Sequence, residues 1–350
     1  MPVALLVLIA VALSACGGES PGAGEADARA AAAPLRAYSI DPAHISVSGL
    51  SSGGYMAVQL DIAFSSSLRG AGVIAAGPYG CAQGSLATAL GPCMSGVGST
   101  DLPRLIALTD RAAASGAIDA TANLSRQKIW LFSGTLDSAV RQSVVDDLAA
   151  YYRHYLGAAN LLYKNDLPAE HSMPTDRPGN PCRARIDPYI DDCGYDAAGQ
   201  LLQFIHGPLR PRNDGAPAGS LIRYDQRAFL PFATSHGLGE TGFAYVPARC
   251  ASGQRCKLHV ALHGCKQYPE YSYFDGVSWV RFGATFATRA GYNRWADSND
   301  FVVLYPQAFP TAANPNGCWD WWGYDDARYA TRRGRQMAAI KAMIDRAAGN

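Results

Sequence analysis

From residue 40 to the C-terminus, short apolar runs alternate with longer stretches whose apolar positions suit a helix. The runs have the length of buried strands and are rich in β-branched and aromatic residues. We predict strands at 44–48, 71–77, 128–133, 160–164, 242–247, 257–262 and 301–306, and helices at 55–66, 102–115, 138–155, 197–205 and 327–348. Strands that alternate with helices are typical of an α/β fold with a mostly parallel sheet flanked by helices.

Two parts of the chain depart from this pattern. Residues 3–12 are apolar but too few to span a bilayer, and Leu13-Ser14-Ala15-Cys16 follows them. We predict an export signal over residues 1–16 that resembles a bacterial lipoprotein box with Cys16 lipidated, although no Lys or Arg precedes the apolar run. Plain secretion is the alternative. Residues 17–37 are rich in Ala, Gly and Glu and predict a flexible tether, so that 38–350 form a single domain.

The second departure lies between residues 206 and 240, where the pattern weakens. The Pro-rich segment 207–217 argues against a continuous helix. We expect this region to be a small boundary or a lid.

Composition narrows the choice of partners. Charged residues make up 17% of the chain, the formal net charge is +1, and no long Lys/Arg block appears. This argues against a nucleic-acid partner. We expect a monomer that meets a membrane only through an N-terminal lipid, either anchored to the outer membrane or free as a secreted or periplasmic protein.

The cysteines favour disulfides. Eight remain after Cys16, an even number in a chain with an export signal. Proximity along the chain suggests the pairs Cys81–Cys93, Cys182–Cys193 and Cys250–Cys256, leaving Cys265 to Cys318. A zinc site is the rival interpretation, but no CxxC pair or His-x-x-x-His cluster accompanies these positions, and we expect no metal.

The stretch Gly49-Leu50-Ser51-Ser52-Gly53 carries the first candidate chemistry. It follows the predicted strand 44–48 and precedes a helix-compatible run. Strand, sharp turn and helix are what a nucleophile elbow needs, because the turn lifts a serine hydroxyl above the edge of the sheet. A Gly/Ser-rich loop is the alternative.

Two later residues complete a candidate triad. Asp137 falls just beyond the predicted strand 128–133, and His171 follows the strand 160–164. Serine, aspartate and histidine in this order are typical of an α/β-hydrolase, where the histidine takes the serine proton and the aspartate orients the imidazole.

Other residues of the same types fit the triad less well. Asp166 and Asp176 are the rival acids, but neither ends a separate strand before the histidine. Three other histidines could be considered as the base of the triad: His154, His206 and His236. We expect each of them to be structural or exposed.

The order of the strands is unusual for such a fold. His263-Gly264 follows the strand 257–262, where many esterases place the second oxyanion donor, but there it precedes the nucleophile. If residue 350 were joined to about residue 40, the elements would fall into the ordinary hydrolase order. We therefore predict a circular permutation.

Five motifs resemble poly(3-hydroxybutyrate) depolymerases and related esterases of the circularly permuted single-domain type. They are Gly49-Leu50-Ser51-Ser52-Gly53-Gly54-Tyr55-Met56, Ser133-Gly134-Thr135-Leu136-Asp137, His171-Ser172-Met173-Pro174-Thr175, Leu262-His263-Gly264-Cys265-Lys266-Gln267 and the segment 316–324 with Cys318-Trp319-Asp320-Trp321-Trp322. Together they cover the chain from about residue 40 to 350.

The resemblance implies a role for each motif. Ser51 would be the nucleophile, with Asp137 and His171 as its partners. The backbone N–H groups of Ser52 and Cys265 would form the oxyanion hole, and a Cys265–Cys318 bridge would hold its loop.

For the acyl subsite, the resemblance implies a tryptophan: Trp322 first and Trp319 second, while Trp321 is as readily a core residue. Four further aromatic residues would extend an apolar surface: Tyr271, Tyr273, Phe274 and Trp279.

The resemblance also implies an activity. Such enzymes hydrolyse short-chain polyhydroxyalkanoates through an acyl-enzyme and need no metal or organic cofactor. Two other interpretations stay open: a feruloyl or acetylxylan esterase, and a surface lipoprotein that binds an apolar polymer without cleaving it.

Overall fold

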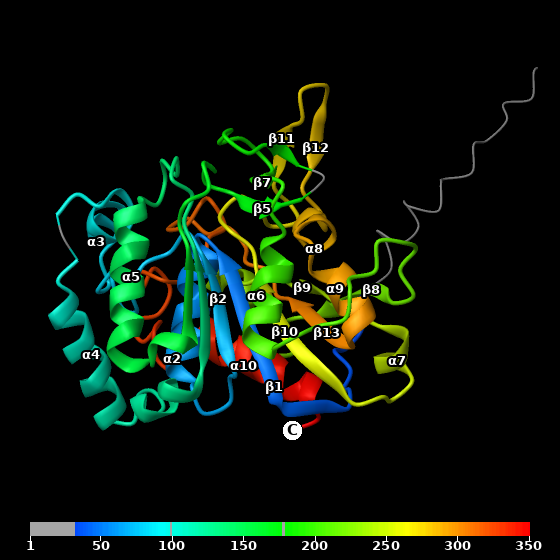
Figure 1. Ribbon diagram of the computed structural model, residues 1–350, viewed down its shortest axis with the longest axis horizontal. Helices are drawn as coiled ribbons and strands as arrows, with labels where there is room; N and C mark the ends of the chain where they lie inside the picture. The colour runs from blue at the N-terminus through cyan, green and yellow to red at the C-terminus, as the bar shows by residue number, and fades with distance from the viewer. Residues whose placement is uncertain (1–31, 99, 177–178) are drawn as a thin grey trace, which may run out of the picture. The chain divides into compact units, whose positions relative to one another are not determined.

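Eight strands form the central sheet of the computed structural model, which describes residues 32–98, 100–176 and 179–350 (Figure 1). They are β1 Ile40–Leu50, β2 Gly70–Ile74, β3 Lys128–Phe132, β4 Leu161–Lys164, β8 Ser220–Asp225, β9 Thr241–Val246, β10 Cys256–Leu262 and β13 Phe301–Tyr305. Their order across the sheet is β4-β3-β2-β1-β10-β13-β9-β8. The strands from β4 to β13 are parallel, and β9 and β8 are antiparallel to their neighbours.

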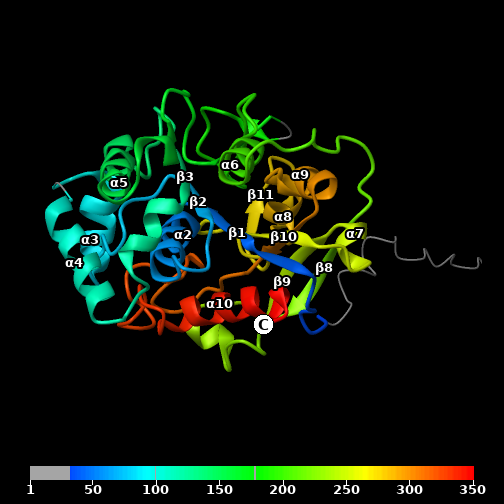
Figure 2. The same ribbon diagram turned by 60° about the horizontal axis from the view of Figure 1, so that its bottom comes forward.

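Helices cover both faces of this sheet. The longer ones are α2 Ser52–Ala63, α4 Leu102–Ala114, α5 Gln142–Tyr155, α6 Ala197–His206, α9 Tyr292–Asn299 and α10 Arg335–Ala348, and the short ones are α3 Leu86–Leu90, α7 Ala248–Ala251 and α8 Thr285–Arg289. Helices α6 and α9 lie on one face, and α2 and α10 lie on the other (Figure 2). The predicted α/β-hydrolase fold with a mostly parallel sheet is confirmed.

Two small β structures stand beside the main sheet. They are the sheet of β5 Met173–Thr175, β6 Asn180–Pro181 and β7 Ile190–Asp192, and the hairpin of β11 Ser272–Phe274 and β12 Trp279–Arg281. Both lie beyond the carboxyl ends of the parallel strands (Figure 1).

The strand order contains the predicted permutation. Followed from β8 to β13 and then from β1 to β4, the strands lie side by side in sequence order except that β10 and β13 are exchanged. The two ends of this path also meet, since the Tyr38 N–H donates to the Ala347 carbonyl at 2.9 Å and Arg346 Nε donates to the Leu35 carbonyl at 3.0 Å. Moving the chain ends to this junction would give the ordinary hydrolase order.

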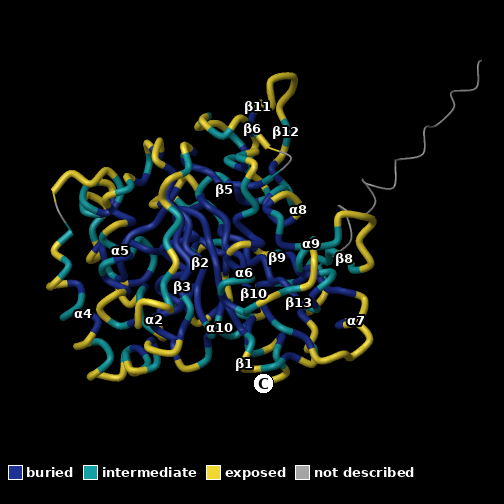
Figure 3. The backbone as a smooth tube through the Cα atoms, viewed as in Figure 1, coloured by how far each residue is buried: buried dark blue, intermediate teal, exposed yellow. Residues whose placement is uncertain are grey.

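The core lies where the sheet is covered on both sides (Figure 3). Every residue of β2 and β13 is buried, whereas β4 at the edge is mostly intermediate. A parallel strand covered on both faces has no polar side to show, which is why these strands appear as continuous apolar runs in the sequence.

Four disulfides connect the loops, and they are the four predicted pairs. Cys81–Cys93, Cys182–Cys193 and Cys250–Cys256 close short loops of 12, 11 and 6 residues. Cys265–Cys318 closes 53 residues and joins the loop after β10 to the tryptophan segment.

Three expectations need correction. The region from 206 to 240 contains β8, which pairs with β9 and completes the sheet, so it is neither a boundary nor a separate lid. The predicted tether reaches too far, because Ala33 pairs with Tyr224 of β8 and Leu35 is buried. The last helix begins at Arg335 rather than near residue 327.

Nothing in the described part of the chain bears on the N-terminal predictions. The export signal, Cys16 and most of the tether lie outside the described residues. Among the helices that the structure does describe, none has the length and apolarity needed to cross a membrane.

Candidate active site

Ser51 lies in the sharp turn between β1 and α2. Its backbone has φ 56° and ψ −123°, a conformation that residues other than glycine rarely adopt. Glycines let the turn close, since a Cβ on Gly49 would lie 2.1 Å from the Gly53 carbonyl oxygen and one on Gly53 would lie 2.4 Å from the Leu262 carbonyl oxygen. The strand, turn and helix expected around Ser51 are therefore present.

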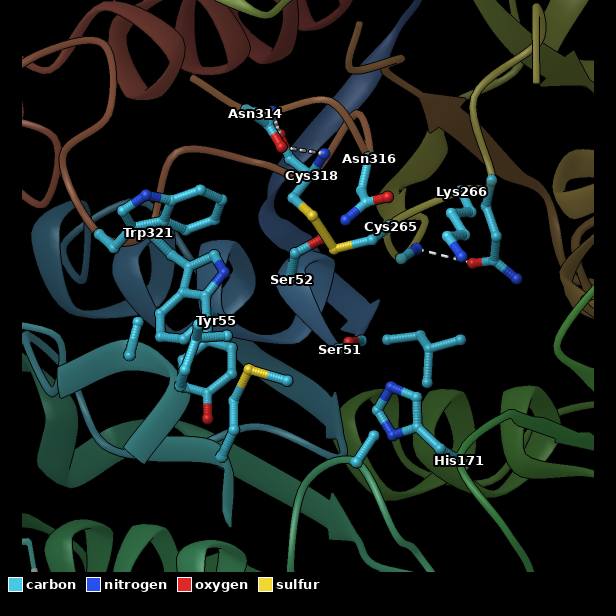
Figure 4. A pocket seen from close by; sticks show the side chains of 18 of the residues that line it. Ser51, Ser52, Tyr55, His171, Cys265, Lys266, Asn314, Asn316, Cys318 and Trp321 are labelled. Carbon is cyan, nitrogen blue, oxygen red and sulfur yellow. Dashed lines mark hydrogen bonds between the residues drawn. A yellow bond between two sulfur atoms is a disulfide. The ribbon is translucent and has the colours of Figure 1, made fainter. Parts of the chain in front are cut away.

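Asp137 and His171 meet at the carboxyl ends of the strands. Their Oδ2 and Nδ1 atoms are 2.9 Å apart, and their side chains are 1% and 10% exposed. Asp137 Oδ1 also accepts hydrogen bonds from the N–H groups of Ala139 at 2.9 Å and Val140 at 2.8 Å. Because Asp137 occupies Nδ1, the Nε2 edge of the ring remains for Ser51, beside which it lies in the same cavity (Figure 4).

Glu170 is a neighbour that the sequence analysis missed. Its Oε2 accepts hydrogen bonds from the N–H of His171 at 2.7 Å and from the N–H of Ser138 at 3.1 Å. One carboxylate thereby joins the loop that carries Asp137 to the loop that carries His171. Nothing in the sequence marks this residue except its position next to the candidate base.

On the other side of Ser51 lie two backbone donors. Ser52 is the first residue of α2, so its N–H has no partner within the helix. Cys265 follows β10, and both residues line the cavity that holds Ser51. Within the described ranges neither N–H donates a hydrogen bond, which leaves both available to an anionic oxygen.

The loop that carries Cys265 is braced by buried side chains. Trp319 Nε1 donates to the His263 carbonyl at 2.9 Å, and Gln267 Oε1 accepts from the Gly264 N–H at 2.6 Å. His263 donates through Nδ1 to the Gly264 carbonyl at 2.7 Å and accepts at Nε2 from the Ala308 N–H at 3.0 Å. Burial lowers the pKa of His263 to about 4, so the ring is neutral near pH 7.

The cavity itself has a volume of about 430 Å³. Aromatic and aliphatic side chains line one side of it, including Tyr55, Met94, Trp321 and Trp322. Tyr55 and Trp321 are stacked with their ring centroids 3.9 Å apart, and the Tyr55 hydroxyl donates to the Cys93 carbonyl. Tyr55 and Trp321 of this apolar wall lie across Ser51 from His171 (Figure 4).

The positions of the three tryptophans differ in part from the prediction. Trp322 reaches the cavity, but Trp319 is fully buried and does not line it, so its predicted place in the subsite is wrong. Trp321 lines the cavity, although its spacing suited the core equally well. The Trp319 indole N–H donates a hydrogen bond to the loop that carries Cys265. No pattern in the sequence reveals which way each ring points.

Of the four aromatic residues predicted to form an apolar surface, only two are well exposed to solvent. Phe274 is 54% and Trp279 is 75% exposed, while Tyr273 is buried. Tyr271 is only partly exposed, and none of the four lines the cavity.

The rival acids and histidines lie elsewhere. Asp166 forms an ion pair with Lys164, and Asp176 pairs with Arg212 and Arg294. Half-buried His206 forms a hydrogen bond with Ser46 Oγ, 2.8 Å away.

The other two histidines do not line the cavity that holds Ser51 either. His236 contacts Asp325 at 2.8 Å, and His154 packs against Tyr155. In the described part of the chain, no group of three or more His, Cys, Asp or Glu side chains has the arrangement of a metal site.

Comparison with known proteins places this geometry in a family, although no protein-family model matches the chain. The sequence is 48% identical over 320 residues to the poly(3-hydroxybutyrate) depolymerase of Delftia acidovorans, covering 90% of this chain and 62% of that enzyme. It is 39% identical over 334 residues to the polyhydroxybutyrate depolymerase of Talaromyces funiculosus, covering 91% of this chain and 93% of that enzyme.

Solved structures agree with these relatives. A serine-to-alanine variant of a PHB depolymerase complexed with an R3HB trimer superposes with a TM-score of 0.82 at 37% identity, covering 90% of this chain and 99% of the other. The crystal structure of the PHB depolymerase from Penicillium funiculosum gives a TM-score of 0.81 at 37% identity over the same shares. The resemblance predicted from the five motifs is confirmed, and the chain belongs to the poly(3-hydroxybutyrate) depolymerase family of serine hydrolases.

Proposed function

We propose that this protein hydrolyses ester bonds of poly(3-hydroxybutyrate) and its oligomers through an acyl-enzyme on Ser51. The observation that carries the proposal is the arrangement around that residue: a strained turn presents Ser51 to one cavity, with the His171–Asp137 pair on one side and two free backbone donors on the other. The comparisons support the substrate, because the related variant binds an R3HB trimer.

Acylation needs a base, an anion site and an acid. A serine hydroxyl is a poor nucleophile at neutral pH, so His171 Nε2 takes its proton while Asp137 stabilises the imidazolium. The N–H groups of Ser52 and Cys265 bind the oxygen that becomes negative as Ser51 attacks. His171 then returns the proton to the leaving alkoxide, which departs as an alcohol.

Deacylation repeats these steps with water. His171 deprotonates a water molecule that attacks the acyl-enzyme, and the same two N–H groups hold the second oxyanion. Ser51 recovers its proton, and the acid product leaves. The apolar wall with Tyr55, Trp321 and Trp322 suits the methyl-branched acyl chain of a hydroxybutyrate unit.

The decisive test is Ser51→Ala. We expect it to reduce hydrolysis of (R)-3-hydroxybutyrate oligomers to a trace and to abolish labelling by a serine-directed fluorophosphonate. Ser252→Ala is the control, since Ser252 is an exposed serine whose hydroxyl donates to the Arg249 carbonyl and which does not line the cavity. Normal activity of Ser51→Ala would refute the assignment, and a wild-type protein without labelling or turnover would favour a binding lipoprotein.

A second assay addresses substrate class. Wild type is offered hydroxybutyrate oligomers and feruloyl esters side by side, and we expect a higher kcat/KM for the oligomers. Preference for the feruloyl esters would favour the carbohydrate-esterase interpretation instead.

We propose further that residues 1–16 direct export and that Cys16 is lipidated in a protein that acts as a monomer. The four disulfides support export, because such bonds persist in oxidising compartments. Incorporation of labelled palmitate into wild type but not into Cys16→Ala would support the anchor, and its absence from both would favour plain secretion. Light scattering of the purified protein tests the monomer.

A further inference from the structure

The cavity around Ser51 carries an unbalanced charge. Two cationic side chains line it, Arg185 and Lys266, and no Asp or Glu is among its lining residues in the described chain. An ester of two neutral groups gains nothing from such a charge. The imbalance therefore indicates a part of the substrate that is itself negative.

Neither cation is neutralised by a close carboxylate. Arg185 is exposed, and its Nη1 donates to the neutral Ser138 Oγ at 3.1 Å. Lys266 is half-buried, and the nearby Asp187 does not line the cavity. Within the described ranges, neither cation comes within ion-pair distance of an acidic side chain. Burial raises the pKa of Asp187, and the positive charge of Lys266 acts against that shift, so the two side chains interact electrostatically without forming a close ion pair.

Both cations lie next to the segments that carry the catalytic groups. Arg185 contacts Ser138, the residue after Asp137. Lys266 follows Cys265, and its N–H is fixed to the Asn316 carbonyl at 2.8 Å. Figure 4 shows Lys266 and His171 on one side of Ser51, with Trp321 and Tyr55 on the other. Because His171 protonates the leaving oxygen, the alcohol fragment lies beside the cations.

The last unit of a hydroxybutyrate oligomer has a carboxylate in that fragment. Its oxygen, which His171 protonates, is joined through two carbon atoms to a free carboxylate. We propose that Arg185 and Lys266 bind this terminal carboxylate, so that the protein cleaves the ester bond nearest the carboxyl end of an oligomer. This inference rests on the proposed function, whose cavity and triad it uses.

The reaction balances without any further reactant. The ester C–O bond breaks, the Ser51 oxygen bonds to the acyl carbon, and 3-hydroxybutyrate leaves with its carboxylate and the proton from His171. Water then releases an oligomer one unit shorter, which again ends in a carboxylate. Each product longer than one unit is therefore a substrate for the same site.

The test compares two trimers of (R)-3-hydroxybutyrate, one with its terminal carboxylate and one with that group as the primary amide, which has the same shape and no charge. The readout is the ratio of their kcat/KM values, acid over amide. We expect wild type to favour the acid by about 10-fold, as for charge-assisted hydrogen bonds. The ratio should fall as salt is added, because screening weakens the attraction.

Variants assign the preference to the two side chains. Arg185→Gln combined with Lys266→Gln should bring the ratio close to one. Arg183→Gln is the matched control, since Arg183 is exposed in the same segment but does not line the cavity, and it should keep the wild-type ratio.

The outcomes separate this inference from the proposed function. Equal rates on acid and amide by wild type, or a double variant that keeps the preference, would overturn the carboxylate site alone. Hydrolysis of neither trimer would overturn the proposed function and this inference together. Product analysis gives an independent readout, because we expect the monomer to be released first from the carboxyl end of the acid, and early release of internal fragments would contradict the site.

Discussion

The two halves of the cavity that meet at Ser51 are held in place by different means. The acid–base half consists of the loops 133–140 and 165–172, which contain no cysteine. Hydrogen bonds join the two loops: Glu170 accepts from the Ser138 N–H, Asp137 contacts His171, and the N–H groups of Thr135 and Leu136 donate to the carbonyls of Leu167 and Ala169. The oxyanion half consists of the loop 263–267 and the segment 314–322, which are joined by a disulfide and by the buried Trp319.

The difference follows from what each half supplies. The acid–base half supplies side chains, and the carboxylates that orient them also hold the loops. The oxyanion half supplies backbone N–H groups, which no substitution except proline removes, so the position of the chain decides whether they work. Single substitutions should therefore damage the first half most, and loss of covalent bracing should damage the second.

The largest effect should come from Asp137→Asn. An amide at this position favours the wrong tautomer of His171, so we expect kcat on hydroxybutyrate oligomers to fall by about 10⁴-fold with little change in KM. Steady-state kinetics of the purified variant measure both. Asp166→Asn, which changes the rival acid, should behave as wild type, and a result with the two variants reversed would move the assignment to Asp166.

A smaller loss should follow removal of the Cys265–Cys318 bridge as Cys265→Ser with Cys318→Ser. A loop displaced by about 1 Å loses roughly 100-fold in kcat. The free energy of unfolding should fall by about 4 kcal/mol, against about 2 kcal/mol for the shorter loop of Cys250 and Cys256.

The Cys250→Ser, Cys256→Ser variant is the control, because these cysteines do not line the cavity. It should lose stability and keep its kcat. If both double variants keep their kcat, covalent bracing is not what holds the oxyanion half.

Glu170→Ala should cost less, about 10-fold in kcat, because only one of the links between the two loops is lost. Glu170→Gln should recover most of the activity, since an amide oxygen still accepts from both N–H groups. The same assays measure this, and KM should stay constant. Equal losses in the two variants would point to the charge of Glu170 rather than to its hydrogen bonds.

The last effect is on stability, leaves catalysis unchanged and depends on pH. Asp61 on α2 is fully buried, its Oδ2 accepts from the Tyr152 hydroxyl at 2.9 Å, and burial raises its pKa to about 7. The folded state thus favours the protonated form, so its contribution is present below about pH 4 and is lost as pH rises to about 7. Asp61→Asn should remove this loss and be more stable than wild type at pH 8 by up to about 4 kcal/mol.

Urea unfolding at pH 5 and pH 8 measures the effect. Asp110→Asn is the control, since Asp110 forms the same contact with Tyr155 at 3.2 Å but is exposed. The contribution of the oxyanion half to stability should depend on pH in the opposite direction, through His263. The lowered pKa of His263 gives a contribution that is present above about pH 6.5 and is lost as pH falls to about 4.

Much of this protein could be predicted from local patterns. The strands appear as apolar runs because both faces of the sheet are covered, and the turn at Ser51 is visible because only glycines fit at Gly49 and Gly53. Asp137 and His171 could be placed because the carboxyl ends of parallel strands meet at one edge. Three of the disulfides could be predicted because a short loop keeps cysteines that are close in sequence also close in space.

What the sequence left open depends on contacts between distant segments and on the direction of side chains. β8 is a half-buried edge strand that exists because β9 offers it a partner. Trp319 and Trp321 are two residues apart and look alike in sequence, yet a carbonyl of the oxyanion loop binds the first and Tyr55 stacks on the second. Glu170, Arg185 and Lys266 gain their places around Ser51 in the same way, because loops far apart in sequence converge on one cavity only when the chain is folded.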